Sequence, residues 1–234
     1  VDLFEAMKKV GRKLHGGVAV QTLLVAVVLA SMSGVIGGET VLLGILALPQ
    51  MLRLGYDKKL AIGTTAAGGA LGTMVPPSIV LIIYGLTANV SIGDLFKASF
   101  LPAFMLAMFY VIYVLVYSKL NPEKAPIPSA EELAADEAKD INYFKALFFP
   151  LLTVAFVLGS IYGGIASVTE ASALGVVGIL LSAAIRKELT WSVVKESTQA
   201  TMRTCGMIIW IGIGATALVL SLIHISEPTR PSQI

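Results

Sequence analysis

Residues 17–52 read GVAVQTLLVAVVLASMSGVIGGETVLLGILALPQML, and this stretch decides the fold. Its single charged residue is Glu39, and basic clusters flank both of its ends. One helix over these 36 residues would be about 54 Å long, whereas two full crossings of a bilayer need about 40 residues and a turn. We therefore expect a re-entrant hairpin over 17–52. Its arms would lie near 18–31 and 39–52, and its glycine-rich tip, Ser33 to Gly38, would be buried inside the protein.

The composition of the whole chain is that of a membrane protein. Of its 234 residues, 56% are hydrophobic and 14% are charged, and the mean hydropathy is +0.83. Soluble domains carry about 25% charged residues. We therefore predict an all-α polytopic membrane protein, and we exclude a soluble enzyme, a nucleic-acid-binding protein and a secreted disulfide scaffold. The one cysteine, Cys205, permits no internal disulfide.

Residues 60–93 form a second long uncharged stretch with a different interruption. Its middle reads GTMVPPS over 72–78. Two consecutive prolines remove two amide donors and prevent the preceding residues from continuing a helix. We expect a broken helix over 59–71 and 79–90. Together with the return span that follows, it makes up residues 59–118.

Charge and length set the remaining segments. Loops rich in Lys and Arg tend to stay cytoplasmic, and the basic clusters therefore define the cytoplasmic side. The expected segments are an interfacial amphipathic helix over 1–16, a cytoplasmic connector over 119–143, further spans over 144–222, and an atypical, non-native tail over 223–234. Within the third of these, the charged stretch 189–203 predicts an interfacial helix before a last span over 205–222. Because the chain begins with Val1, we expect it to start inside a larger protein.

A hairpin tip beside a broken helix predicts an ion and substrate site. Secondary transporters place such interruptions near the middle of the membrane, where backbone carbonyls coordinate Na⁺ and helix N-termini face anions. Ser33, Thr73 and Ser78 would add the hydroxyl oxygens that Na⁺ prefers. The alternative is that the glycines and prolines only kink and pack these helices.

Two acidic residues stand at expected helix starts. Glu39 is an intramembrane carboxylate, which by default marks a functional site, but a first-turn acid also complements the helix dipole. Glu170 follows Ser167 at capping-box spacing, so it has the same two interpretations. The sequence holds no nucleophile–base pair, phosphate-binding loop or metal-ligand spacing. We predict no catalytic residue, no cofactor and no metal other than sodium.

These segments, as an ordered set, resemble a known family. The motifs are Met32-Ser33-Gly34, Leu48-Pro49-Gln50-Met51, Gly68-Gly69-Ala70-Leu71-Gly72 running into Pro76-Pro77-Ser78-Ile79, and Gly163-Gly164 with Thr169-Glu170-Ala171. They are similar to the large membrane subunit of tripartite ATP-independent periplasmic (TRAP) transporters, the DctM-like family. The resemblance covers residues 3–222 and identifies the chain as a fragment of such a subunit.

The resemblance implies a sodium-driven elevator transporter of the bacterial inner membrane that is built from inverted repeats. The chain would hold the end of the first repeat and, over 144–222, the start of the second. The organic acid would come from a periplasmic substrate-binding protein, and a small membrane subunit would complete the assembly in the lipid bilayer. The implied sodium ligands are Ser33, Val35, Gly72, Val75 and Pro77, and the candidates for the substrate region are Gly34, Gly38, Glu39, Thr73, Ser78, Thr169 and Glu170. Many members of the family have Ser where this chain has Val35, so only a backbone carbonyl could serve there.

Two other classes remain open on the sequence. A channel, or a structural membrane subunit without coupled transport, could also use a re-entrant segment. An intramembrane enzyme would need paired catalytic residues, which the sequence lacks. Stoichiometric uptake coupled to sodium would distinguish a transporter from a channel.

Overall fold

The computed structural model describes residues 14–34, 37–127, 143–185, 187 and 189–226, and every regular element among them is a helix. The chain divides into two compact units, Val1–Ile179 and Leu180–Ile234. Within the described residues, three helices are long and apolar enough to cross a membrane, namely Ile92–Leu120, Val168–Ile185 and Trp191–Leu222.

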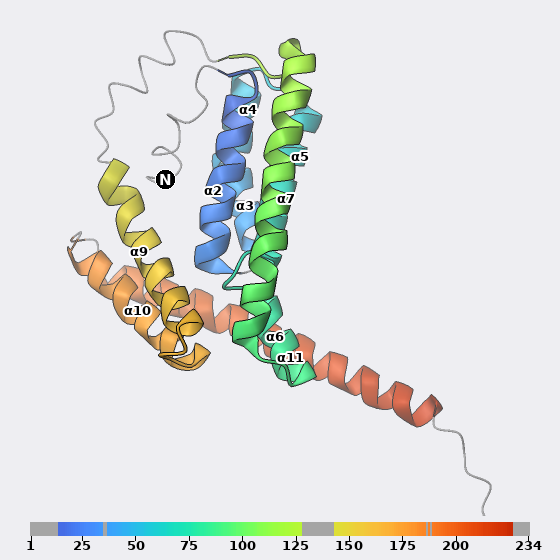
Figure 1. Ribbon diagram of the computed structural model, residues 1–234, viewed down its shortest axis with the longest axis vertical. Helices are drawn as coiled ribbons and strands as arrows, with labels where there is room; N and C mark the ends of the chain where they lie inside the picture. Colours follow the sequence, from blue (N-terminus) through green and yellow to red (C-terminus); the bar gives the residue numbers. More distant parts are fainter. Residues whose placement is uncertain (1–13, 35–36, 128–142, 186, 188, 227–234) are drawn as a thin grey trace, which may run out of the picture. The chain divides into compact units, whose positions relative to one another are not determined.

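The first unit begins with a helical hairpin (Figure 1). Its arms are α2 (Gly17–Ser33) and α3 (Gly38–Leu46). The first arm ends at Gly34, whose left-handed backbone (φ 57°) lets its amide bond to the carbonyl of Ala30. The second arm, expected as one helix, continues as the separate helix α4 (Leu48–Arg53). The division falls beside Pro49, which has no amide hydrogen to continue the helical ladder.

A broken helix follows the hairpin. Its first part, α5 (Lys58–Ala70), begins at Asp57, whose carboxylate accepts hydrogen bonds from the amides of Lys59 (3.0 Å) and Leu60 (3.2 Å). A short 3₁₀ turn, η1 (Leu71–Thr73), leads into irregular backbone. The helix resumes as α6 (Ile79–Ala88). The interruption therefore lies where the two prolines predict it.

The return span is α7 (Ile92–Leu120). The hydroxyl of Ser91 caps it by accepting a hydrogen bond from the amide of Asp94 (3.3 Å). An N-cap of this kind satisfies one of the amides that a helix start leaves open, so the charged residues Asp94 and Lys97 fit inside the first turns. A second 3₁₀ turn, η2 (Pro122–Lys124), follows α7.

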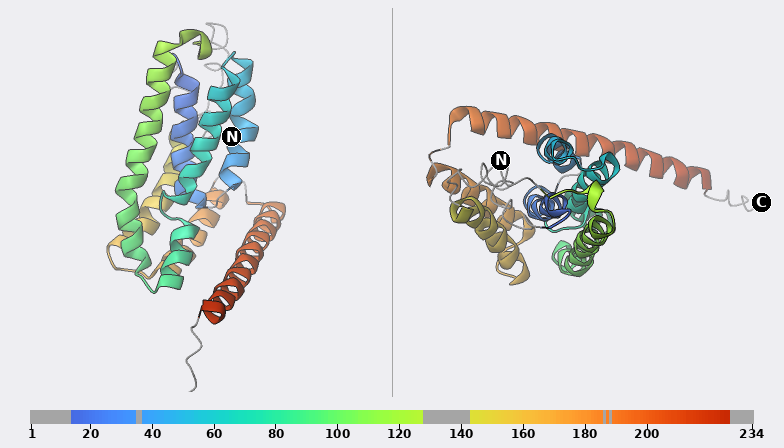
Figure 2. Two further views of the ribbon diagram at one scale, coloured as in Figure 1. Left: turned by 90° about the vertical axis from the view of Figure 1, so that its right-hand side faces the viewer. Right: turned by 90° about the horizontal axis from the view of Figure 1, so that it is seen from above.

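The centre of this unit is α2, which packs against α3, α5 and α7 (Figures 1 and 2). Small side chains are frequent in this core, and its fully buried alanines are Ala19, Ala26, Ala30, Ala47, Ala61 and Ala125. Inside a bilayer there is little hydrophobic drive between helices, so close packing of small residues is the main source of association. The composition of this core is therefore that of a membrane bundle.

Three loops meet at one end of the bundle and close the base of the hairpin. The amide of Val18, on the first arm, donates to the hydroxyl of Tyr56, just after the second arm (3.2 Å). The amide of Asp57 donates to the carbonyl of Lys124 (2.9 Å), and the amide of Gly16 to that of Ala125 (3.3 Å). Burial raises the pKa of Tyr56, against a smaller lowering effect of the Val18 amide, so this hydroxyl stays neutral. The two ends of the hairpin thus lie together.

Two further helices complete the first unit and lead into the second. They are α9 (Tyr143–Tyr162) and α10 (Val168–Ile185). The second unit holds the end of α10 and the 36-residue helix α11 (Trp191–Ser226). The expectation of two separate segments over 189–203 and 205–222 is wrong, because α11 runs through both without a break. No glycine or proline separates them, and the Thr204 hydroxyl donates to the carbonyl of Ala200 (3.0 Å) within an unbroken helix.

Three expected segments fall partly outside the described residues. Of the helix expected over 1–16, only residues 14–16 are described. Of the connector over 119–143, the structure describes the part up to residue 127 and residue 143. Of the tail over 223–234, residues 223–226 belong to α11. The location of these segments relative to a membrane stays a prediction.

Candidate functional site

The tip of the hairpin contacts the break of the interrupted helix. The carbonyl of Gly34 accepts a hydrogen bond from the amide of Ile79, the first residue of α6 (3.2 Å). A Cβ added to Gly34 would overlap the carbonyl oxygen of Pro77 and lie 3.2 Å from the Cα of Ser78. Gly34 also has φ 57°, which side chains rarely adopt. Both the contact and the backbone angle therefore require glycine at this position.

The break is held together by its own hydrogen bonds. The Ser78 hydroxyl donates to the carbonyl of Thr73 (2.8 Å), and the Thr73 hydroxyl donates to the carbonyl of Ala70 (2.8 Å). Pro76 and Pro77, joined by a cis peptide bond, have no amide hydrogens. The helical bonds that residues 76 and 77 would give to the carbonyls of Gly72 and Thr73 are therefore missing. The Ser78 hydroxyl replaces the bond at Thr73, which leaves the Gly72 carbonyl without a helical amide donor.

Glu39 lies against the same break from the second arm of the hairpin. It stands in the first turn of α3, and its side chain is 3% exposed. A Cβ added to Gly72 would lie 2.6 Å from Oε1 of Glu39. One turn earlier on α5, a Cβ on Gly69 would overlap the side chain of Thr40. The two glycines therefore let the head of α3 sit directly on α5 and η1.

Four helix ends converge at this contact. The carboxyl ends of α2 and of the α5–η1 segment carry partial negative charge, whereas the amino ends of α3 and α6 carry partial positive charge. Such an arrangement offers carbonyl oxygens to a cation and amides to an anion. The chemistry of the site is therefore suited to a cation and an anionic group bound close together.

The structure brings most of the predicted site residues into this region and leaves others elsewhere. Those at the tip or the break are Gly34, Glu39, Gly72, Thr73, Val75, Pro77 and Ser78. Ser33 is the last residue of α2 and Gly38 is the first of α3, so both flank the tip. Val35 lies outside the described residues. The described residues of the hairpin tip and of the break therefore lie together, and their ligand stays a prediction.

Thr169 and Glu170 belong to a different local structure. The Glu170 carboxylate accepts hydrogen bonds from the amide (2.8 Å) and the hydroxyl (2.7 Å) of Ser167, while the Glu170 amide donates to that hydroxyl (3.3 Å). This reciprocal pattern is a capping box at the start of α10. Both Thr169 and Glu170 are exposed. The capping interpretation therefore accounts for Glu170 in this structure.

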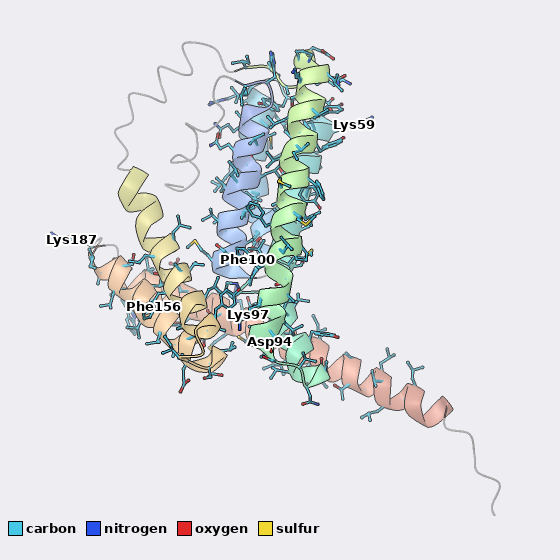
Figure 3. The ribbon with its side chains drawn as sticks, viewed as in Figure 1. Lys59, Asp94, Lys97, Phe100, Phe156 and Lys187 are labelled. Atoms are coloured by element: carbon cyan, nitrogen blue, oxygen red, sulfur yellow. The ribbon has the colours of Figure 1, made fainter. Side chains whose placement is uncertain are left out.

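Sequence reasoning missed three residues near the tip. Thr40 and Gly69 form the close contact described above, and only the glycine spacing on α5 could have indicated it. Phe96, fully buried, lines an apolar cavity of about 220 Å³ beside Met32 and Pro77. Figure 3 shows Phe100 and Phe156, both more than half exposed, on α7 and α9. An aromatic residue in an aromatic-rich span gives no signal of which ring is buried.

Charged side chains other than Glu39 contribute little to this site. Within residues 14–34, 37–127, 143–185, 187 and 189–226, no group of three His, Cys, Asp or Glu side chains is placed to hold a metal ion. The ion pair of Asp94 and Lys97 is exposed, with 3.9 Å between Oδ1 and Nζ (Figure 3). Exposed pairs of this kind stabilise a fold by about 1 kcal/mol at most.

Comparison with protein families gives one match over nearly the whole chain. The model of the family described as "Tripartite ATP-independent periplasmic transporter, DctM component" matches residues 2–232. This family consists of membrane permeases of transporters and not of enzymes.

Three curated relatives illustrate the match. The C4-dicarboxylate TRAP transporter large permease protein DctM of Vibrio cholerae is 32% identical over 70% of this chain and 35% of its own length. The isethionate TRAP transporter permease protein DctMQ of Oleidesulfovibrio alaskensis is 30% identical over 84% of the chain and 30% of its own length. The sialic acid TRAP transporter permease protein SiaT of Haemophilus influenzae is 30% identical over 88% of the chain and 33% of its own length. The chain spans about a third of the length of each of these relatives.

Proposed function

Because the chain belongs to the DctM component family of tripartite ATP-independent periplasmic transporters, we propose that its complete protein carries an organic acid across the inner membrane, driven by a sodium gradient. The observation that carries the proposal is the contact of the hairpin tip with the broken helix, from Gly34 to Pro77 and Ile79. Interrupted helices of this kind form the ion and substrate sites of secondary transporters.

The sodium site is assigned to the carboxyl ends of α2 and of the α5–η1 segment. Its ligands are the hydroxyl of Ser33, the carbonyl of Val35, and oxygens from Gly72, Val75 and Pro77. The Gly72 carbonyl is supported best, because residue 76 is a proline and gives it no helical hydrogen bond. The Glu39 carboxylate beside Gly72 adds negative charge where a cation would bind.

The substrate is assigned to the amino ends of α3 and α6. Their first amides have partial positive charge, which favours a carboxylate or a sulfonate. The printed names of the three relatives refer to C4-dicarboxylate, isethionate and sialic acid, and each of these compounds carries an acidic group. The substrate-region residues are Gly34, Gly38, Glu39, Thr73 and Ser78, and Thr169 and Glu170 are kept as outer candidates.

The arrangement in the membrane follows from the same geometry. The base of the hairpin is closed by the bond from Val18 to Tyr56, which supports re-entry from one side. We assign that side to the cytoplasm because Lys58 and Lys124 lie there. Cysteines at positions 9 and 58, which lie before and after the hairpin in the sequence, should then both be labelled from the cytoplasmic side of intact vesicles, and a cysteine at Asn89 from the other side. Labelling of 9 and 58 from opposite sides would contradict the hairpin.

The partners are those that a tripartite system implies. A periplasmic substrate-binding protein would deliver the organic acid, and a small membrane subunit would join the permease. The chain would supply the end of one inverted repeat and the start of the next in an elevator mechanism. The family membership supports these assignments.

The direct test is sodium-driven uptake by the complete transporter, reconstituted in liposomes with its binding protein. Ser33→Ala should weaken the apparent sodium affinity roughly five- to hundred-fold, because a lost buried ligand or hydrogen bond of this kind costs about 1–3 kcal/mol. Ser31→Ala is the matched control, since the Ser31 hydroxyl is already engaged by the carbonyl of Val28 (2.7 Å). Equal sodium dependence in the two variants would contradict the sodium site. Uptake down a substrate gradient with no sodium coupling would favour a channel.

A further inference from the structure

A groove at the basic end of the first unit has no role in the transport site. It is bounded by α2, α5 and α7 and encloses about 590 Å³, within the range of small-molecule sites. The residues that give it chemistry are Lys59, Thr64, Tyr110, Tyr113 and Tyr117, and Leu23 is among the apolar residues of its wall. Figure 3 shows Lys59 at the end of the bundle opposite Asp94 and Lys97.

Thr64 lines this groove and carries a buried hydroxyl. The residue is 4% exposed, and its Oγ1 has no hydrogen-bond partner among the described residues. Its neighbour Thr65 behaves as helical threonines usually do, donating to the carbonyl of Ala61 (2.9 Å). A buried hydroxyl left without a partner is costly, so Thr64 is a candidate donor to a group that binds in the groove.

The groove has a polar end, formed by tyrosines and lysines, and an apolar end. The rings of Tyr113 and Tyr117 stack with 5.9 Å between centroids. Nζ of Lys124 lies 5.5 Å from the centroid of Tyr117 and donates to its hydroxyl (3.4 Å). Tyrosines favour the boundary between headgroups and hydrocarbon, and lysines there attract phosphate. Beyond Thr64 the lining is apolar, with Leu23 and Ala67.

We propose that this groove binds an anionic glycerophospholipid. Its phosphate would lie at Lys59 beside the tyrosine hydroxyls, an ester carbonyl would accept the hydrogen of Thr64 Oγ1, and an acyl chain would run along the apolar wall. A free phosphate would leave the apolar part empty, and a peptide would bring amides that this wall cannot pair. An anionic headgroup is favoured over a zwitterionic one because Arg53 and Lys124 lie at the same end of the bundle as Lys59.

The test is native mass spectrometry of the complete transporter, released from nanodiscs that contain equal amounts of phosphatidylglycerol and phosphatidylcholine. We expect the protein to retain phosphatidylglycerol in preference. Lys59→Gln should lower that retention about fivefold, which corresponds to ~1 kcal/mol for one lysine near a phosphate. Its backbone amide still bonds to Asp57, so the start of α5 is preserved. Thr64→Val, which removes only the hydroxyl, should also lower retention.

Lys58→Gln is the matched control, because Lys58 is the neighbouring exposed lysine and does not line the groove. Melting temperatures of all variants establish that each is folded. Equal losses in Lys58→Gln and Lys59→Gln would overturn the site in favour of general surface charge. Equal retention of the two lipids, or no retained lipid in the parent protein, would overturn it as well. None of these outcomes depends on transport, so the proposal can fail while the transport function holds.

Discussion

Glu39 and Glu170 stand at the heads of α3 and α10, and both follow a glycine pair in the sequence, yet the structure places them in opposite environments. Glu39 is 3% exposed, with its carboxylate against Gly72. Glu170 is exposed and bonded to Ser167 of its own turn. The same acid at a helix start is therefore a buried contact in one case and a local cap in the other.

The difference arises from the neighbouring helix. Opposite α3, the helix α5 and its extension present glycines at 69 and 72, which lie on one face because they are three residues apart. The Glu39 carboxylate is buried at the place where this backbone comes close to the head of α3. In the second case the glycines, at 175 and 178, belong to α10 itself. A Cβ added to either would meet the side chain of Val157 or of Thr153 on α9. Both acids lie in the first turn of a helix, so this position does not determine whether the carboxylate is buried. The packing of the partner helix determines it.

Disrupting the close contact between α3 and α5 should have the largest effect. Gly69→Ala would place a Cβ 2.7 Å from the Cα of Thr40, so the head of α3 would have to move away from α5. Overpacking of this kind costs about 1–3 kcal/mol and occasionally more. We expect a lower melting temperature of the complete transporter, together with loss of uptake in the protein that remains folded.

Gly63→Ala is the control on the same helix. A Cβ at that position meets no atom within 4 Å, and alanine favours helix by about 1 kcal/mol over glycine. The control variant should be as stable as the parent or more so. Equal stability of the Gly63→Ala and Gly69→Ala variants would mean that the contact of α3 with α5 is not as close as the structure has it.

Replacing each of the two acids by glutamine should have the next-largest effect, and the two variants should differ in sodium affinity. Glu39→Gln keeps the shape of the side chain but removes the negative charge beside the break, so uptake should show an apparent sodium affinity roughly ten- to hundred-fold weaker, on the basis of about 1.5–3 kcal/mol for a charged partner. Glu170→Gln should leave sodium dependence unchanged, because glutamine also fits a capping box. Sodium titrations of uptake at matched amounts of folded protein make the measurement. A comparable loss in both variants would place Glu170 in the site after all.

The two helix interruptions, over 33–38 and 72–78, were predictable from the sequence. Length alone made 17–52 too long for one span and too short for two, and Pro76 and Pro77 fixed the break. The structure has helices on both sides of each interruption. Local chemistry of this kind is readable because proline lacks an amide and glycine adopts left-handed angles, whatever the rest of the protein does.

The contacts across elements were predictable only in part. The sequence indicated that tip and break meet, but it could not pair Gly69 with Thr40 or bury Phe96, because those depend on the rotation of one helix against another. The prediction of a separate helix over the charged stretch 189–203 was wrong for a related reason. Charge predicts contact with water, but it does not end a helix, and α11 continues through it. The identity of the bound ion depends on oxygens from several elements and stays a prediction.

The smallest expected effect concerns the cap of α10. Ser167→Ala removes the hydroxyl that bonds the Glu170 carboxylate and accepts from the Glu170 amide, and it leaves the bond from the Ser167 amide in place. Loss of an N-cap serine costs about 1 kcal/mol, so amide hydrogen exchange in the first turn of α10 should become roughly fivefold faster. Ser172→Ala is the control, since the Ser172 hydroxyl bonds only to the carbonyl of Thr169 in its own helix (2.7 Å) and caps nothing. Sodium-driven uptake should be unchanged in both variants. A large loss of uptake in Ser167→Ala, with Ser172→Ala normal, would show that the head of α10 is coupled to transport and that its acid is more than a cap.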